Sequence, residues 1–424
     1  MKHSGKYSGK HSGALAAIFL LATLPLHGQS GMRDRYFVRY PFEKWKTETP
    51  RAELKWSPKI QPARLSTQQR LNLRVETVID AKEMEKRRGR GEVVILLELT
   101  DAEGRRWRSH EIFELTQIPE AAKAAAMLYT QNALVLPGEY RVCLAVVDSQ
   151  TMEHSFLSKT VHVGGLRNDP LPDAWKGVPA VEFSRNYEPP DNWFQPFLRG
   201  RLNLPARSQR PVHVDVIMNM TPSERAAGSL RVFRRNMGVL VPALKVLGGI
   251  SVTTGSLDVT LLDLTRRKTW NQPDAHGSLD WRKLREPFAT TTPGMVDVQA
   301  LAAKAQMSRF FRDQVLEKLK TEREREPLRV VIVLSSPVSF DKQSHFDTET
   351  LARDPSRRLF YISYRALNQA RMLASLPEGA PAPPAIYDEL EPIVKSLDGR
   401  VFNVITPEDF RRAVAVILAE ISHM

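Results

Sequence analysis

The serines, histidines and single cysteine are the residues through which this 424-residue chain would carry out nucleophilic chemistry. A hydrolytic set would draw on Asp215, Asp258, Asp263, Ser223, Ser335 and Ser336. Hydrolases of this kind need a histidine beside the nucleophile and commonly a Gly-x-Ser-x-Gly elbow. The sequence has no such elbow, and His213 falls inside an apolar run. We therefore expect a protein that is not an enzyme, and an exported hydrolase is the alternative of a different class.

Motifs for metals and cofactors are also missing from the sequence. The histidines after residue 28 lack the HExxH and Cys/His spacings that are typical of zinc sites. The turn Asn219-Met220-Thr221-Pro222-Ser223 has none of the glycines that bring a pyrophosphate to backbone amides, and no Walker loop occurs. We expect no cofactor and no bound metal.

The second half of the chain alternates between apolar strands and amphipathic helices. Strands are expected at 212–218, 256–264, 328–334, 359–363 and 401–404, and helices at about 230–247, 298–319, 390–397 and 407–421. This alternation favours an α/β doubly wound sheet, with the purely apolar run 328–334 at its centre. Ligands of such sheets bind at the carboxyl ends of the strands.

The turn at 219–223 resembles the first motif of the von Willebrand factor type A domain, Asp-x-Ser-x-Ser, whose oxygens hold a divalent cation. The resemblance extends over about residues 211 to 422. It includes the order of strands and helices, Gly248-Gly249 before the second strand, the loop and helix at 293–301, and the closing segment 397–402. With its leader and a preceding sandwich, the whole chain resembles the von Willebrand factor A-related secreted proteins of acidobacteria.

The resemblance implies a cation site, but one that is degenerate. Its positions correspond to Asn219, Thr221, Ser223, Val296, Asp297, Ser335 and Ser336. A hard cation favours carboxylate oxygens, whereas Asn219 is neutral and Val296 has no ligand atom. Only Asp297 would supply a carboxylate, and only if its loop were re-registered. We expect these side chains to cap the first helix and bond the strand ends; a cation-dependent adhesion protein with a modified metal site is the alternative.

Residues 67–165 show the pattern of an all-β immunoglobulin-like sandwich. Strands are expected at 71–79, 93–99 and 140–147, with a last strand ending at Val163. The run Pro137-Gly138-Glu139-Tyr140-Arg141-Val142 resembles the beginning of the penultimate strand of immunoglobulin-like and fibronectin-like modules. Cys143 has no activating histidine beside it in sequence, so we expect a buried strand residue.

The remaining segments are a leader, an extended N-terminal segment at 29–66, and a Pro- and aromatic-rich strap at 166–210 between the two domains. Residues 1–28 have the basic, apolar and polar order of a signal peptide, which predicts cleavage near Gln29. We expect a secreted or periplasmic protein with no transmembrane segment after signal removal, and an uncleaved anchor helix is the alternative.

The chain is basic, with a formal net charge of +13. Its basic runs at 82–90 and 320–326 are interleaved with glutamates, which is typical of solvated loops and helix ends. We expect no nucleic acid partner, and attraction to an anionic cell envelope is the simpler use of the charge.

The expected function is therefore metal-independent interaction with an unknown protein or cell-envelope component, through the 211–424 domain. Loops at the carboxyl ends of the strands, at 219–225, 265–276, 290–297 and 335–346, would form the binding face. The candidate partner-binding residues are Trp270, Met295, Val338 and Phe340.

Overall fold

The computed structural model describes residues 35–48, 52–87, 89–117, 126–184, 198–221, 230–275, 279–291, 304–320, 327–338, 354–365 and 387–424. The chain divides into two compact units. The first, here called the β unit, comprises Met1–Gln61, Val75–Gln131 and Glu139–His162, and the second, the α/β unit, comprises Pro62–Arg74, Asn132–Gly138 and Val163–Met424. These bounds differ from the expected ones, because the whole of 166–210 groups with the α/β unit. The expected leader, 1–28, lies outside the described residues.

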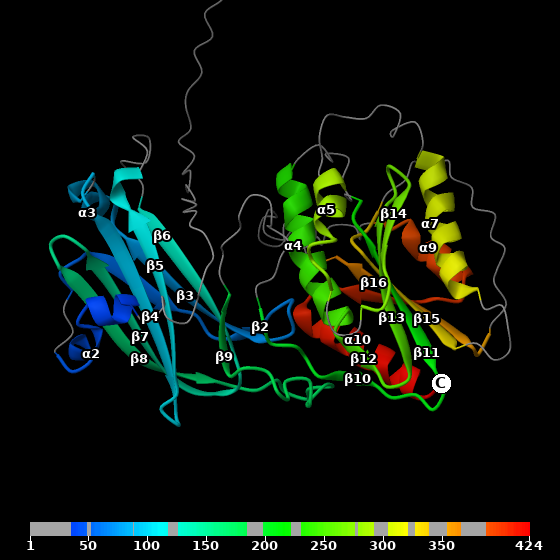
Figure 1. Ribbon diagram of the computed structural model, residues 1–424, viewed down its shortest axis with the longest axis horizontal. Coiled ribbons are helices and arrows are strands. Elements are labelled where there is room, and N and C mark those ends of the chain that lie inside the picture. Colours follow the sequence, from blue (N-terminus) through cyan, green and yellow to red (C-terminus); the bar gives the residue numbers. More distant parts are fainter. Residues whose placement is uncertain are drawn as a thin grey trace, which may run out of the picture. The chain divides into compact units, whose positions relative to one another are not determined.

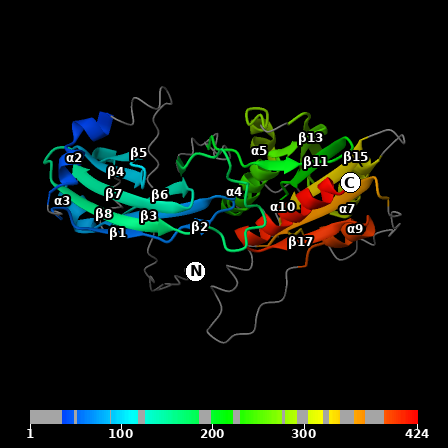
Figure 2. The same ribbon diagram turned by 90° about the horizontal axis from the view of Figure 1, so that it is seen from below.

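A four-stranded antiparallel sheet in the order β5-β4-β7-β8 forms the centre of the β unit (Figure 2). Its strands are β4 (Glu92–Asp101), β5 (Arg106–Glu114), β7 (Gly138–Asp148) and β8 (His154–Val163). Alternate residues of β4, including Val94 and Leu96, pack with Phe42 and Trp45 of helix α2 (Phe42–Trp45). The intervening residues of β4 are equally buried, so this strand is covered on both faces.

A second sheet has the order β1-β3-β6-β9, and β2 pairs with β3. Its strands are β1 (Trp56–Ile60), β2 (Arg64–Leu65), β3 (Leu71–Ile79), β6 (Met127–Val135) and β9 (Val181–Ser184). The expected extended segment at 29–66 therefore contains α2, β1 and β2, and the expected strap supplies β9. Among the described aromatic side chains of these segments, Phe37, Tyr40, Phe42 and Trp45 lie in one hydrophobic cluster, and Trp175 packs against another. Exposing their area to water would cost roughly 25 cal/mol per Å².

The α/β unit contains a six-stranded sheet in the order β14-β13-β11-β15-β16-β17 (Figure 1). Its strands are β11 (Val212–Asn219), β13 (Gly255–Asp263), β14 (Lys268–Gln272), β15 (Leu328–Ser335), β16 (Arg357–Tyr364) and β17 (Arg400–Val404). All neighbouring pairs are parallel except β13 with β14. The short strands β10 (Leu204–Ala206) and β12 (Ile250–Val252) form a separate parallel pair.

Helices cover both faces of this sheet. The described helices are α4 (Leu230–Leu247), α5 (Arg285–Thr291), α7 (Lys304–Leu319), α9 (Leu390–Ser396) and α10 (Pro407–Ser422). Helices α4 and α10 bury Phe233 and Phe410 in the hydrophobic cluster that contains Val330 of β15. Helices α7 and α9 bury Phe311 and Ile393 in the cluster that contains the next residue, Val331. The apolar run of β15 thus contributes side chains to two hydrophobic cores, one on each face of the sheet.

Within the described ranges, no helix is both long and apolar enough to cross a membrane. The apolar run at 14–26, on which the leader was predicted, lies outside those ranges.

Candidate functional site

The carboxyl ends of β11 and β15 bring together four of the expected degenerate metal-site residues. Asn219 ends β11 and is 1% exposed. Its Nδ2 donates to Ser335 Oγ at 2.9 Å, and its Oδ1 accepts the N–H of Thr221 at 2.9 Å. Thr221 Oγ1 accepts the N–H of Leu264 at 2.7 Å, and Ser335 Oγ donates to the carbonyl oxygen of Ser336 at 2.6 Å. These side chains bond the strand ends to one another.

Asp388 completes this edge of the sheet, and sequence reasoning missed it. Its Oδ2 accepts hydrogen bonds from Tyr361 Oη and Ser363 Oγ, both at 2.7 Å. Its Oδ1 accepts the N–H groups of Val338 and Leu390, both at 3.2 Å. Burial raises the pKa of Asp388, and the bonds from Tyr361 and Ser363 offset only part of that rise. The described carboxyl-end network thus consists of Asn219, Thr221, Ser335, Ser336, Tyr361, Ser363 and Asp388.

Of the other expected site residues, only Val338 and Trp270 are among the described residues. Ser223, Val296, Asp297, Met295 and Phe340 lie outside the described residues.

Two of the candidate partner-binding residues are described, and neither stands exposed on a loop. Val338 is 3% exposed and lies in the hydrophobic cluster under α7 and α9, so it is a core residue. Trp270 is partly buried against the opposite cluster. It belongs to β14, an edge strand that occupies the middle of the loop expected at 265–276, because this segment pairs with β13.

A basic pocket of about 410 Å³ opens in the α/β unit, and sequence reasoning missed it too. It is lined by Gln68, Arg70, Leu198, Arg199, Gly200, Arg201, Leu202, Lys245, Val246, Gly248, Gly249, Leu279 and Trp281. Four of these side chains are cationic and none is acidic, while leucines and a tryptophan supply the apolar wall. The lining comes from four separate stretches of sequence, which no local spacing reveals.

Burial and short contacts fix the inner wall of the basic pocket. Arg70 is 2% exposed; its Nη1 lies 2.5 Å from Glu182 Oε2, and its Nη2 donates to the carbonyl oxygen of Pro179 at 2.7 Å. A Cβ added to Gly200 would lie 2.8 Å from Arg70 Nη1 and 2.9 Å from Glu182 Oε2, so only glycine fits here without a shift.

Lys245, in the last turn of α4, is the cationic residue of the pocket whose pKa is shifted. Its Nζ donates to the carbonyl oxygen of Leu198 at 2.8 Å. Burial lowers the pKa of Lys245 to about 8, and the charges of Arg201 and Arg70 act in the same direction against Glu182. An anion in the pocket would supply the missing negative charge.

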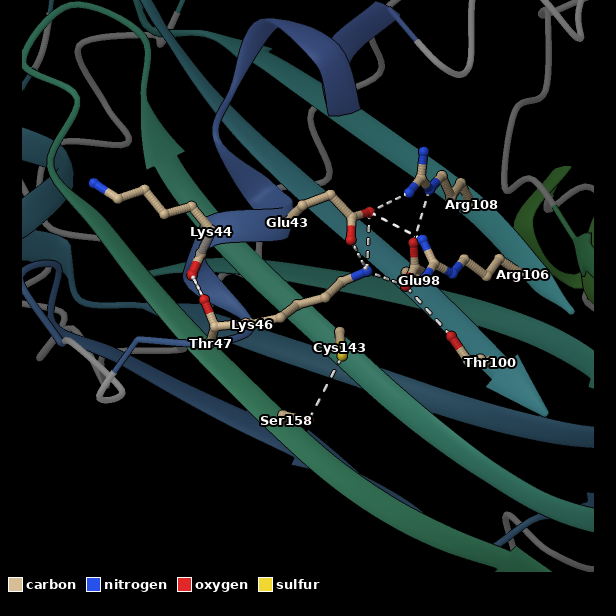
Figure 3. A network of polar contacts seen from close by, with 10 residues as sticks. All are labelled: Glu43, Lys44, Lys46, Thr47, Glu98, Thr100, Arg106, Arg108, Cys143 and Ser158. Carbon is tan, nitrogen blue, oxygen red and sulfur yellow. Dashed lines mark hydrogen bonds and ion pairs between the residues drawn. The ribbon is translucent and has the colours of Figure 1, made fainter. Parts of the chain in front are cut away.

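The β unit has a charged network of its own, shown in Figure 3. Glu98 of β4 is fully buried, and its carboxylate lies 2.5 Å from Lys46 Nζ and 2.7 Å from Arg108 Nε. Burial alone would raise the pKa of Glu98, but the hydrogen bonds from Lys46 and Arg108 outweigh it and lower the pKa. Glu43 of α2 contacts the same two cations. The network therefore ties α2 to strands β4 and β5.

Cys143 lies buried in β7, as expected from sequence. Burial raises the pKa of its thiol, with Ser158 Oγ at 3.5 Å from Sγ. A thiol with a raised pKa is a poor nucleophile at neutral pH, so Cys143 is a packing residue.

Comparison with known proteins assigns no family to this chain. No protein-family model and no curated protein matches it. Among solved structures, a protein described as ApaA from Bordetella pertussis is 16% identical, with a TM-score of 0.16, over 27% of this chain and 94% of that one. A family 2 glycosyl hydrolase from Bacteroides cellulosilyticus is 10% identical, with a TM-score of 0.20, over 75% of this chain and 43% of that one. A family 123 glycoside hydrolase from Clostridium perfringens is 8% identical, with a TM-score of 0.20, over 82% and 72%. Likeness this low carries no argument about fold or activity.

Proposed function

We propose that this protein is an exported, non-catalytic binding protein that recognises an anionic, phosphate-bearing component of the cell envelope through the basic pocket of its α/β unit. The observation that carries the proposal is the lining of that pocket, which holds four cationic side chains and no acidic one. The proposal keeps the von Willebrand type A-like assignment of this unit, which the strand order β14-β13-β11-β15-β16-β17 supports.

The charge of the pocket favours an anion over a neutral ligand. Arg70 is compensated by Glu182, whereas Arg199 and Arg201 bring exposed cationic side chains to the same lining. A hydrogen bond to a charged group contributes roughly 1.5 to 3 kcal/mol, so two or three such bonds suffice for selective binding. The basic net charge, +13 for the whole sequence and 13 − 3 = +10 without the three lysines of the expected leader, would also speed the approach to an anionic surface.

The carboxyl-end network supports binding that needs neither catalysis nor a metal ion at that edge. Ser335 Oγ is bonded to Asn219 and Ser336, and Asn219 uses both ends of its amide within the protein. A bound cation would compete with these bonds for the same oxygens, and neither residue offers it a carboxylate. Titration with Mg²⁺ should leave the free energy of unfolding unchanged, whereas binding at 100 times Kd would add about 2.7 kcal/mol.

The direct experiment measures binding of the full chain to phosphatidylglycerol vesicles and to phosphatidylcholine vesicles. We expect binding to the anionic vesicles only, with competition by inorganic phosphate. Because the pKa of Lys245 is about 8, the pocket loses a positive charge between pH 7 and pH 9, so affinity should fall over that range. Equal binding to both vesicles would refute the proposal, and capture of a protein partner unaffected by phosphate would replace it.

Export and the absence of catalysis have separate tests. The intact mass of protein recovered outside the cytoplasm should lack the first 28 residues or so, and retention of the leader would favour an anchor helix. A panel of ester and glycoside substrates should show no turnover. Turnover that follows the protein through purification would establish the hydrolase alternative.

A further inference from the structure

A second cluster lies near the amino ends of β11 and β13, away from the carboxyl-end network. His213 and Asp215 are two residues apart on β11, so their side chains share one face of the sheet. The parallel register places Ser256 opposite His213, and Asp258 opposite Asp215. Lys318 of α7 contacts Asp215 on that same face. The sequence signal was the short His-x-Asp run, but only the register of β13 adds the second carboxylate.

The geometry of the cluster matches a set of metal ligands. His213 Nε2 lies 3.1 Å from Asp215 Oδ2 and 3.5 Å from Asp258 Oδ2, and one ligand atom from each residue lies within 4.8 Å of the others. Bonds of about 2.0 to 2.1 Å in a tetrahedral site separate neighbouring ligands by roughly 3.3 to 3.4 Å. One nitrogen and two carboxylate oxygens are a donor set that suits Zn²⁺.

Each of the three side chains also contacts a residue outside the cluster, which fixes its orientation. His213 Nδ1 is hydrogen-bonded to Ser256 Oγ, which leaves Nε2 facing the two carboxylates. Asp258 Oδ1 accepts the N–H of Asp274 at 3.0 Å, and Asp215 Oδ1 lies 3.0 Å from Lys318 Nζ. Outer contacts of this kind orient the ligands of metal sites.

Asp215 is the buried carboxylate of the cluster. Its side chain is 1% exposed; Lys318 Nζ lies at ion-pair distance from Oδ1, and His213 Nε2 lies at ion-pair distance from Oδ2, although neither contact has the geometry of a full hydrogen bond. A buried carboxylate is costly unless it is paired or coordinates a metal, and Lys318 pairs with only one of the two oxygens, which leaves Oδ2 facing His213 and Asp258. The His213 and Asp258 side chains are 14% and 22% exposed, so the cluster is open to ions from solvent.

We propose that His213, Asp215 and Asp258 bind one Zn²⁺ ion per chain, with a fourth position left to water or to a donor from a ligand. The residue types also include Ser, His and Asp, as in hydrolases. A triad holds its imidazole with one carboxylate, however, whereas here two carboxylates face the same nitrogen. Two carboxylates that face one imidazole nitrogen are suited to binding a metal cation between them.

The test is equilibrium dialysis of the chelator-treated full chain against ZnCl₂, with Co²⁺ absorption as a second readout of the ligand geometry. We expect one Zn²⁺ bound per chain, and at least tenfold weaker binding in His213→Gln and in Asp258→Asn. His162→Gln and Asp280→Asn are matched controls outside the cluster, and they should bind as the wild type does. The far-UV circular dichroism spectrum of each variant shows that it is folded.

Two results with Zn²⁺ would overturn the proposal, and one with other cations. One is wild-type protein that binds no Zn²⁺ above the level of buffer. The other is binding that survives in both His213→Gln and Asp258→Asn, which would place the ion on histidines elsewhere, such as those at positions 3, 11 and 27. Binding of Ca²⁺ or Mg²⁺ in preference to Zn²⁺ would also contradict the nitrogen-containing donor set.

Discussion

The carboxyl-end network and the basic pocket are both polar regions of the α/β unit. In the network the polar groups hydrogen-bond one another, whereas the pocket has an excess of positive charge. At the carboxyl ends, Asp388 accepts four hydrogen bonds, and Asn219 and Ser335 bond each other. The lining of the pocket instead contains more cations than its neighbour Glu182 can balance. A polar region whose groups bond one another stabilises the fold, and one with excess charge is suited to a ligand.

The largest effect should follow from removing Asp388. In Asp388→Ala, Tyr361 and Ser363 lose a shared buried acceptor, and two backbone N–H groups lose theirs. We expect a loss of about 3 kcal/mol in the free energy of unfolding, measured by urea titration. Glu408→Ala, at an exposed position on α10, is the control and should cost less than about 0.5 kcal/mol. Equal losses in the two variants would show that the network adds no stability.

The next effect concerns the pH dependence of stability at Lys245. Its folded pKa of about 8 lies below its unfolded value of about 10.5, so the unfolded chain binds more protons between these values. Stability contributed by this residue therefore rises with pH, by about 2 kcal/mol from pH 8 to pH 10. Lys245→Met should remove that rise, so the measurement is the difference between the two urea titrations across this range. If the free energies of unfolding of the wild type and of Lys245→Met change in parallel with pH, burial does not lower the pKa of Lys245.

A smaller loss of stability is expected from Asn219→Ala. The substitution leaves the N–H of Thr221 without its acceptor and removes the donor to Ser335 Oγ, which keeps only its bond to the carbonyl oxygen of Ser336. The expected cost is about 1 to 2 kcal/mol, with no change in binding to anionic vesicles. Asn203→Ala, on an exposed residue whose amide makes one long 3.4 Å contact, is the control. Weaker vesicle binding in Asn219→Ala alone would mean that the carboxyl ends take part in recognition.

The smallest change should come from Arg201→Ala, and it should appear in binding alone. Arg201 is exposed at the rim of the pocket, so unfolding should shift by less than about 0.5 kcal/mol. Affinity for phosphatidylglycerol vesicles should fall about fivefold, close to 1 kcal/mol. Arg207→Ala removes an exposed charge outside the lining and should bind as the wild type does. If both variants lose affinity equally, the attraction is general and the pocket is not selective.

The secondary structure could be predicted from the sequence only in part. Apolar runs located β11, β13, β15 and β16, because strands that are buried on both faces are largely hydrophobic. The edge strand β17 was found from the short run 401–404, although only Val404 of this strand is buried. Strand β5 was not predicted, since RWRSHEIFE is polar and mostly half-buried. Helix α2 was also missed, because four residues are too few to show a period.

Sites were harder to predict than strands because they depend on contacts between distant residues. Asn219, Thr221 and Ser335 were found through a family motif, and the structure places them together. Asp388 and the basic pocket had no such motif. Arg70 and Lys245 line one pocket although 175 positions separate them, and no pattern of local spacing encodes that proximity.

The most direct test of the central claim is a comparison of two matched double charge reversals. Arg199→Glu with Arg201→Glu reverses the rim of the pocket, and Arg207→Glu with Arg210→Glu makes the same change of net charge at exposed positions outside the lining. Binding to phosphatidylglycerol vesicles is measured at about 0.15 M salt, where charges more than roughly 8 Å apart are largely screened. We expect the first variant to lose at least tenfold in affinity and the second to stay within twofold of the wild type. Equal losses in both, or none in the first, would contradict recognition through the pocket.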